Sequence, residues 1–194
     1  MSFELDEIDI AIISLLQKNG VMSTREISRF VGLSHTAIGR RLRKLPIKIT
    51  AVFSRDIVKG LILVVGKLRS RSAIDEIVNT FKNCPRMLMF ATGGSDRYMA
   101  LMFAEDQSVI DCISLDCEVR MHPEIEESRT YVLDRVHIPD YIYIKIPTER
   151  RDVAPCGRNC LTCRRFKEGT CPGCPATYAY RGPLIVRRRR SSTQ

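Results

Sequence analysis

The sequence lacks a long hydrophobic run. Its apolar stretches, such as Leu61–Val65, are far short of the roughly 20 residues that a membrane-spanning helix needs. The first residues, Met1–Glu7, are acidic where a secretory signal would be basic and then apolar. We therefore expect a cytoplasmic protein without a membrane partner.

Histidine is scarce, and no grouping of side chains suits catalysis. The three histidines fall in three different expected elements. They are His35, His122 and His137. No serine or cysteine lies beside a plausible base, and Cys84, Cys112 and Cys117 are expected to be small buried residues rather than nucleophiles. We therefore predict a protein that is not an enzyme.

Acidic residues are nearly absent from two stretches of a chain whose net charge is +9. Residues 150–194 hold eleven Lys and Arg against two acids, whereas residues 1–149 hold twenty of each sign. Within the neutral part, residues 34–48 carry five basic side chains and no acid. Two separate basic stretches indicate a polyanionic partner, most simply nucleic acid. The run Arg187–Arg190 by itself is equally typical of a solvated surface.

The first 48 residues have the pattern of three helices. Apolar residues at helical spacing predict a helix over residues 5–18. Ser23–Glu26 has the form of a capping box, which predicts a short second helix ending at Gly32. Ser34 can cap a third, basic helix. Helix, short helix, glycine turn and basic helix predict a helix-turn-helix domain over residues 1–48.

The third predicted helix has a polar and basic outer face, because Ile38, Leu42 and Leu45 fall on its inner side. Recognition helices present their first residues to base edges and their basic residues to phosphates. We predict that double-stranded DNA contacts this helix and its cap. The candidate residues are Ser34, His35, Thr36, Gly39, Arg40, Arg41, Arg43 and Lys44. The alternative is an ordinary three-helix packing unit with a basic side.

Residues 49–60 have the pattern of an extended linker, and residues 61–147 that of a second domain. The expected elements are a strand at 61–68, a helix capped by Ser72, strands at 87–91 and 98–104, a helix carrying Val109 to Cys117, and a strand at 129–136. This β-α-β-β-α-β order predicts a ferredoxin-like α+β fold with both helices on one sheet face. Tyr141–Ile146 is expected to add an edge strand. The uncovered face should stack against a second copy and form a homodimer.

These two domains together resemble the Lrp/AsnC family of prokaryotic transcription regulators. The matching positions are Leu5-Asp6, Asp9, Leu15-Leu16, Ile27, Gly32–Ser34, Ile38, Arg41-Leu42 and Leu45, then Thr92-Gly93, Asp96 and the strand-helix-strand pattern to Val136. The resemblance implies a winged DNA-binding head. It also implies a second domain that senses a small molecule such as an amino acid and forms dimers, often assembled into octamers.

The resemblance further places an effector site at the loop formed by Gly93, Gly94, Ser95 and Asp96. Two positions depart from the family pattern. Leu45 runs directly into Pro46, so the wing is expected to be shortened or absent, and Ser95 stands where the family often has an aromatic residue. Siroheme decarboxylases resemble the same family, but their aromatic and histidine-rich pocket motifs are not evident in this sequence.

Cysteine, by contrast, is concentrated near the C-terminus, within a module predicted over residues 153–184 and followed by a basic tail at 185–194. Cys160/Cys163 and Cys171/Cys174 are pairs of cysteines separated by two residues, here called C-x2-C hooks. Each hook can place two thiolates on one metal, and thiolate-rich sites select zinc or an iron–sulfur cluster. We predict a zinc site, with an iron–sulfur cluster as the alternative. The candidate ligands are Cys156, Cys160, Cys163, Cys171 and Cys174, with the hooks Cys160/Cys163 and Cys171/Cys174 as the favoured set.

The metal is expected to fold this module, because the segment has few large apolar residues of its own. Once folded, it should present a basic surface made of Arg158, Arg164, Arg165 and Lys167. The sequence thus predicts a DNA-binding transcription regulator with a metal-stabilised tail. The alternative is a metal or redox sensor that binds nucleic acid through that tail.

Overall fold

The computed structural model describes residues 4–184. The chain forms two compact units that divide between Ala51 and Val52. Among the described residues, none of the helices combines the length and hydrophobicity that a membrane crossing requires. The predicted basic tail at 185–194, with the run Arg187–Arg190, lies outside the described residues.

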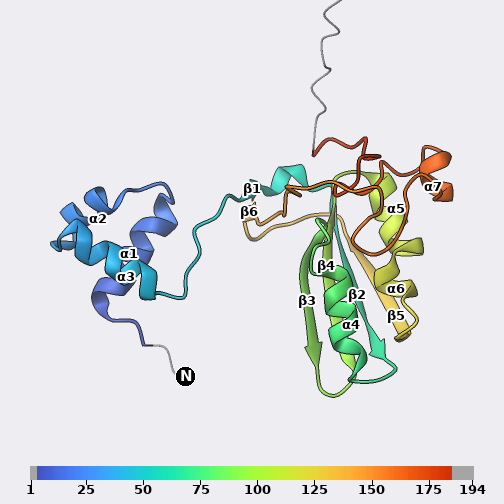
Figure 1. Cartoon of the computed structure of the whole chain (residues 1–194), viewed down its shortest axis with the longest axis horizontal. Coiled ribbons are helices and arrows are strands. Elements are labelled where there is room, and N and C mark those ends of the chain that lie inside the picture. The colour runs from blue at the N-terminus through green and yellow to red at the C-terminus, as the bar shows by residue number, and fades with distance from the viewer. Residues whose placement is uncertain (1–3, 185–194) are drawn as a thin grey trace, which may run out of the picture. The chain divides into compact units, whose positions relative to one another are not determined.

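The first unit contains three helices, α1 (Glu7–Lys18), α2 (Thr24–Val31) and α3 (His35–Lys44), as Figure 1 shows. Their apolar sides meet in one small core. Its buried members are Ile12, Leu16, Ile27 and Ile38. Leu42 and Ile47 pack against this core while only partly buried. The predicted inner face of the third helix is therefore confirmed.

Local capping explains where these helices begin and end. Ser23 and Glu26 form the predicted capping box at α2, and the helix ends at Gly32, whose φ of 75° suits a residue without a side chain. Ser34 accepts a hydrogen bond from the amide of Ala37 and caps α3. A second capping box, between Asp6 and Asp9 at α1, was not anticipated from the sequence.

The segment after α3 contains no wing. Residues 45–52, all within the described part of the chain, form neither a helix nor a strand. Pro46 lacks an amide hydrogen and disfavours helical geometry in the residue before it, so α3 ends at Lys44. Of the two outcomes left open for the wing, its absence is the one observed.

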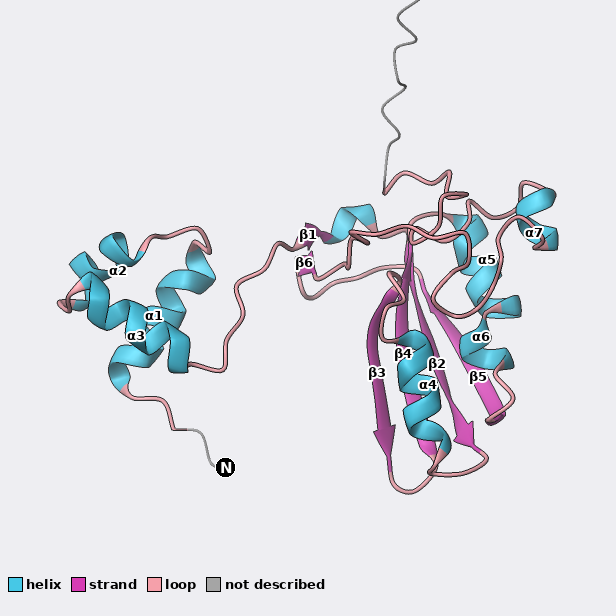
Figure 2. Ribbon diagram, in the orientation of Figure 1, coloured by secondary structure: helices cyan, strands magenta, loops and turns pink. Residues whose placement is uncertain are grey.

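The second unit is built on a four-stranded antiparallel sheet with the order β3-β4-β2-β5. The elements are β1 (Phe53–Ser54), η1 (Arg55–Ile57), β2 (Gly60–Leu68), α4 (Ala73–Phe81), β3 (Met87–Gly93), β4 (Arg97–Ala104), α5 (Gln107–Asp116), α6 (Glu118–Met121), β5 (Ile125–Leu133), β6 (Tyr141–Ile142) and α7 (Arg164–Lys167). Figure 2 shows the strands of this sheet in magenta and the helices in cyan. This order and the two main helices make the predicted ferredoxin-like fold, confirmed together with the α+β class.

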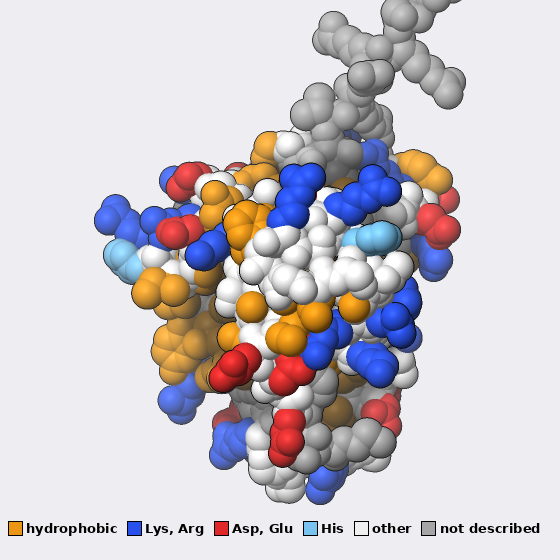
Figure 3. Space-filling view, turned by 90° about the vertical axis from the view of Figure 1, so that its left-hand side faces the viewer, with side chains coloured by type: hydrophobic (Ala, Val, Ile, Leu, Met, Phe, Trp, Pro, Cys, Tyr) orange, Lys and Arg blue, Asp and Glu red, His pale blue; other side chains and the backbone are white. Residues whose placement is uncertain are grey.

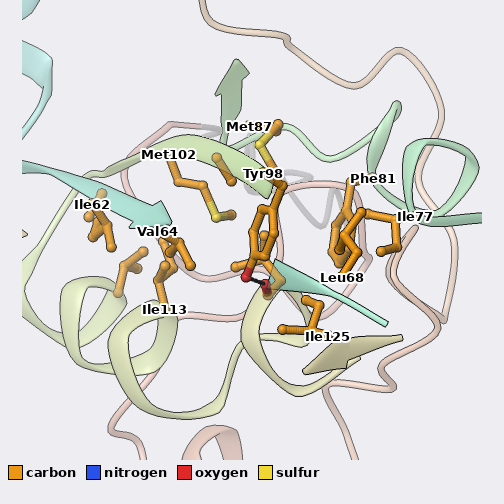
Figure 4. Packing of buried hydrophobic residues seen from close by; sticks show 14 of the residues in the cluster. Ile62, Val64, Leu68, Ile77, Phe81, Met87, Tyr98, Met102, Ile113 and Ile125 are labelled. Atoms are coloured by element: carbon orange, nitrogen blue, oxygen red, sulfur yellow. Dashed lines mark hydrogen bonds between the residues drawn. The ribbon is translucent and has the colours of Figure 1, made fainter. Parts of the chain in front are cut away.

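The core of this unit lies between the sheet and helices α4, α5 and α6. Strand residues alternate between faces, so that Ile62 and Val64 of β2 are fully buried beneath the helices. Figure 4 shows Tyr98 of β4 in the middle of this cluster, and its hydroxyl donates to the carbonyl of Val119 at 3.1 Å. This core thus positions α5, which carries Cys112, and the turns after α4 and α5, which carry Cys84 and Cys117.

The opposite face of the sheet, here called the open face, is lined by Leu63, Val65, Met89, Met99, Leu101, Tyr131 and Leu133. Met99 is 39% exposed and Tyr131 is 48% exposed. One end of this face is closed by Phe103, which is buried with Ile142 and Ile144. Most of an apolar sheet surface therefore remains accessible in the single chain.

Two details of the second domain differ from the sequence prediction. Tyr141–Ile146 does not extend the main sheet, because β6 instead pairs with β1 in a separate two-stranded sheet. Burial of Ile142 and Ile144 against Phe103 favours that position. Ser72 precedes α4 but makes no capping hydrogen bond, since its hydroxyl is paired with Ser70.

Candidate functional site

The recognition-helix candidates form an exposed surface on α3. Ser34, His35, Thr36, Arg40, Arg43 and Lys44 are exposed, and Gly39 is half-buried. The last turn of the helix is basic, with no acid in its first turn. On the face of the molecule drawn in Figure 3, Lys and Arg side chains lie in several separate groups. The predicted outer face of α3 is thus available to a polyanion.

Arg41 differs from the other candidates, because its guanidinium is held by α1. Its Nη1 lies 2.6 Å from Asp6 and 2.8 Å from Asp9. The hydrogen bonds that Arg41 donates to these two carboxylates raise the pKa of its guanidinium. The side chain therefore links α3 to the capped start of α1, and it positions the helix rather than projecting freely from it.

The predicted effector loop is the tight connection between β3 and β4. Gly93, Gly94 and Ser95 are exposed, and Gly94 has a φ of 64°. Asp96 is half-buried, with its carboxylate 3.9 Å from the amine of Lys67. The loop alone therefore offers one carboxylate, the Ser95 hydroxyl and backbone groups.

Beside this loop, the sheet carries a hollow of about 440 Å³ that the sequence did not reveal. It is lined by Val65, Gly66, Arg97, Tyr98, Glu127, Ser128, Arg129 and Tyr131. Residues 93–96 are not among its lining residues. A Cβ at Gly66 would lie 2.2 Å from the carbonyl oxygen of Glu127, so this strand position requires glycine.

The C-terminal segment, residues 153–184, brings its five cysteines to one cavity of about 80 Å³ next to α5 and α6. Three more cysteines line the same cavity: Cys84 follows α4, Cys112 lies on α5, and Cys117 joins α5 to α6. The chain contains eight cysteines in all. The cavity, here called the cysteine pocket, therefore gathers every cysteine of the protein.

The thiols of the cysteine pocket lie close enough to affect one another. A hydrogen bond from Cys112 lowers the pKa of Cys171 to about 6. Burial, with nearby Cys84 and Cys156, raises the pKa of Cys117 to about 12. Burial and the same two neighbours raise the pKa of Cys174 to about 12. Sequence spacing could not show this proximity, and Cys84, Cys112 and Cys117 were expected only to be small buried residues.

The five predicted metal ligands line the cysteine pocket, but their sulfurs are not arranged around a common metal position. Between residues 4 and 184, no group of three or more His, Cys, Asp or Glu side chains is arranged to hold a metal ion. The Cys160 sulfur accepts hydrogen bonds from the Cys174 amide at 3.4 Å and from the Thr177 hydroxyl at 3.7 Å. Such bonds to sulfur are typical of the surroundings of thiolate sites.

A buried ion pair anchors the segment beside the pocket. Arg86 and Glu105 form two hydrogen bonds, one of them between Nε and Oε2 at 3.0 Å. Arg86 also donates to the carbonyl of Gly173 at 2.8 Å, and Tyr180 donates to Glu105 at 2.9 Å. Burial acts to lower the pKa of Arg86, but the bonds to Glu105 and its charge raise it overall. Arg86 therefore stays charged, and the pair joins the sheet domain to the turn between Cys171 and Cys174.

The predicted basic surface of the segment is wrong for two of its four residues. Arg158 lies 2.7 Å from Glu118, and Arg165 is paired with Asp116. Both acids belong to the α5–α6 region. Arg164 pairs with Glu168 within the segment. Arg158 and Arg165 therefore dock the segment onto the helices of the second domain instead of forming a free cationic surface.

Comparison with known proteins agrees with the geometry of the first unit. Residues 5–45 match the model of the AsnC-type helix-turn-helix domain. The regulator FL11 of Pyrococcus abyssi is 49% identical over 45 residues, which cover 23% of this chain and 30% of that protein. The matched region thus spans less than a third of FL11. The chain carries an AsnC-type helix-turn-helix domain.

Longer alignments extend into the second unit. The uncharacterised regulator y4tD of Sinorhizobium fredii is 28% identical over 118 residues, or 54% of this chain and 68% of that one. A Neisseria meningitidis regulator solved with L-Met has a TM-score of 0.56 at 22% identity, covering 70% of this chain and 93% of its own. Escherichia coli AsnC has a TM-score of 0.56 at 14% identity, covering 71% and 97%. The fold is thus that of these solved regulators, and the curated relatives FL11 and y4tD are named as transcriptional regulators.

Proposed function

We propose that this chain is a cytoplasmic, sequence-specific DNA-binding transcription regulator of the Lrp/AsnC type. The observation that carries the proposal is the match of residues 5–45 to the AsnC-type domain, combined with the exposed basic face of α3. His35 and Thr36 at the start of α3 are placed to meet base edges. Arg40 and Arg43 reach bases or phosphates, whereas Arg41 holds α3 against α1.

Replacing Arg40 or Arg43 with alanine should weaken operator binding by about 1–3 kcal/mol if that arginine reads a base, and weaken binding to random DNA less. Genome-wide crosslinking would supply the operator, and fluorescence anisotropy would measure both affinities. Lys18→Ala is a matched control, because it removes one positive charge from the end of α1. Unchanged operator affinity in both arginine variants would rule out recognition through this face.

A small-molecule effector is proposed for the region of Gly93–Asp96 and the adjoining hollow. The hollow presents both signs of charge through Arg97, Glu127 and Arg129, which suits a zwitterion such as an amino acid. The complex of the Neisseria regulator with L-Met supports this class of ligand. Calorimetric titration with the common amino acids would test the assignment, and no heat with any of them would contradict it.

We further propose that the open face joins two copies into a homodimer, from which octamers can assemble. Exposed apolar area of this kind is typical of an interface. Met99→Glu should convert the dimer to a monomer in light scattering, because it places a carboxylate in the apolar contact. Leu115→Glu is the control, since Leu115 is 58% exposed on α5. A dimer that persists in Met99→Glu would move the interface to another surface.

The C-terminal segment is proposed to bind a soft metal through its cysteines, with zinc favoured and an iron–sulfur cluster as the alternative. The shared cysteine pocket supports this role. A second candidate function, metal or redox sensing, is favoured by the same pocket, because a thiolate site can gain or lose its metal. The docked positions of Arg158 and Arg165 argue against the segment being the main nucleic-acid surface.

A further inference from the structure

The cysteines of this chain are concentrated in one part of the structure. The first unit contains no cysteine, and neither does the apolar cluster around Phe103 and Ile142. All eight instead line one cavity, although they come from the turn after α4, from α5, from the α5–α6 junction and from the C-terminal segment. Small buried residues used only for packing would be spread over all of the cores. Their convergence indicates a shared chemical role.

The walls of the cysteine pocket suit thiolates. Met102, Ile113 and Phe166 provide apolar sides, and the arginines Arg86 and Arg158 line the same cavity. A centre with four thiolates around a divalent ion is anionic, and the guanidinium groups of Arg86 and Arg158, although each is also paired with a carboxylate, offset part of that charge. The cavity of about 80 Å³ exceeds several times the roughly 10–15 Å³ that a single water requires.

We propose that the eight cysteines form one site with two metal centres, each held by four thiolates, and that both centres take ligands from the sheet domain as well as from the C-terminal segment. The metal class is one that prefers sulfur in a tetrahedral arrangement, zinc or iron–sulfur. This site adds Cys84, Cys112 and Cys117 to the five ligands of the segment. Because no three of the described His, Cys, Asp or Glu side chains are arranged to hold a metal, the sulfurs must move to reach the roughly 2.3 Å of a bond to zinc.

The eight candidate ligands form two sets: five from the C-terminal segment, and Cys84, Cys112 and Cys117 from the sheet domain. Within the first set, Cys160/Cys163 and Cys171/Cys174 are C-x2-C hooks, each able to place two thiolates on one metal. The Cys174 amide donates a hydrogen bond to the Cys160 sulfur at 3.4 Å, so the two hooks lie side by side. Five cysteines complete only one four-thiolate centre, whereas the three from the sheet domain bring the total to the eight that two centres require.

A metal site shared with the sheet domain has a different structural role from a site within the segment alone. Metal held by five cysteines of the segment would fold only that segment. Metal held by both sets fastens the segment to α5, α6 and the end of α4. Loss of the metal would then remove this fastening and leave contacts such as those of Arg86, Arg158 and Arg165 to hold the segment, so the strength of its attachment would depend on metal.

The decisive measurement uses the unmodified full chain. Protein purified without oxygen is freed of metal and titrated with Co²⁺, and the sulfur-to-cobalt charge-transfer absorbance is followed. We expect saturation at two equivalents, with the absorbance per cobalt of a four-thiolate centre. Five cysteines can complete only one such centre, so saturation at one equivalent would overturn the proposal while leaving a metal-binding segment intact. No binding would overturn both.

Single variants then test whether the cysteines of the sheet domain bind metal. Cys84→Ser and Cys112→Ser should each lower the cobalt capacity from two equivalents to one. Ser114→Ala is the matched control on α5, because its buried hydroxyl has no hydrogen-bond partner. Circular dichroism confirms that each variant is folded. Full capacity in both cysteine variants would overturn the proposal.

The native metal is identified on protein as purified. A colourless protein with two zinc ions per chain supports the proposal in its zinc form. A brown protein with iron and inorganic sulfide, whose absorbance halves in Cys84→Ser and in Cys112→Ser, supports it in its iron–sulfur form. Operator binding through α3 is measured separately, so failure of the metal site does not affect the test of the DNA-binding proposal.

Discussion

Replacing Arg86 with methionine should lower the free energy of unfolding of the second unit by about 3–5 kcal/mol. Arg86 is 8% exposed and Glu105 is 9% exposed, so the variant leaves a carboxylate buried without its counterion. It also removes the donor to the Gly173 carbonyl. This loss exceeds that from most single substitutions because an unpaired buried charge is involved.

Tyrosine fluorescence during urea denaturation can measure this effect specifically, because all six tyrosines lie in residues 98–180 and report on the second unit alone. The double variant Arg86→Met/Glu105→Gln is the companion experiment. It removes both charges and keeps an acceptor for the Tyr180 hydroxyl, so it should recover much of the lost stability. A loss of less than about 1 kcal/mol in the free energy of unfolding of Arg86→Met would instead indicate that the ion pair is exposed to solvent.

Replacing Ile27 with alanine should unfold much of the first unit. Ile27 is fully buried, in a core of four residues. Large-to-small core substitutions of this kind cost about 2–5 kcal/mol. A domain of this size has a total stability of only a few kcal/mol, at roughly 0.05–0.15 kcal/mol per residue. The variant should therefore lose helical circular dichroism and operator binding together.

The same helix provides the control for this experiment. Phe30 is 69% exposed on α2, so Phe30→Ala should change stability by no more than about 0.5 kcal/mol. The tyrosine transition of the second unit should be unchanged in both variants, because the two units are separate compact bodies. Wild-type helical content and affinity in Ile27→Ala would show that the core is not needed to maintain α3.

Much of the local structure could be predicted from sequence. The capping box of Ser23 and Glu26, the left-handed Gly32 and the cap at Ser34 were identified correctly. Each depends on residues no more than a few positions apart, so sequence spacing is sufficient evidence. The apolar runs at 61–68 and 98–104 likewise predicted β2 and β4, the two strands at the centre of the sheet.

Pairing between distant residues could not be predicted in the same way. Tyr141–Ile146 has the alternation of a strand, but alternation does not state the partner, and β6 pairs with β1. Arg158 and Arg165 looked like free cations because Glu118 and Asp116 lie more than 30 positions away in sequence. Arg41 likewise looked like a DNA contact until its pairing with Asp6 and Asp9 was seen.

The sequence by itself determined the helix-turn-helix, the ferredoxin-like order of elements and the five clustered cysteines, because periodicity, caps and hook spacing are local properties. Only the tertiary structure decided that Cys84, Cys112 and Cys117 join those five in one cavity. The reason is physical: α4, α5 and α6 pack on one face of the sheet, so that Cys84, Cys112 and Cys117 line the same cavity, and the buried Arg86–Glu105 pair then holds the C-terminal segment beside it.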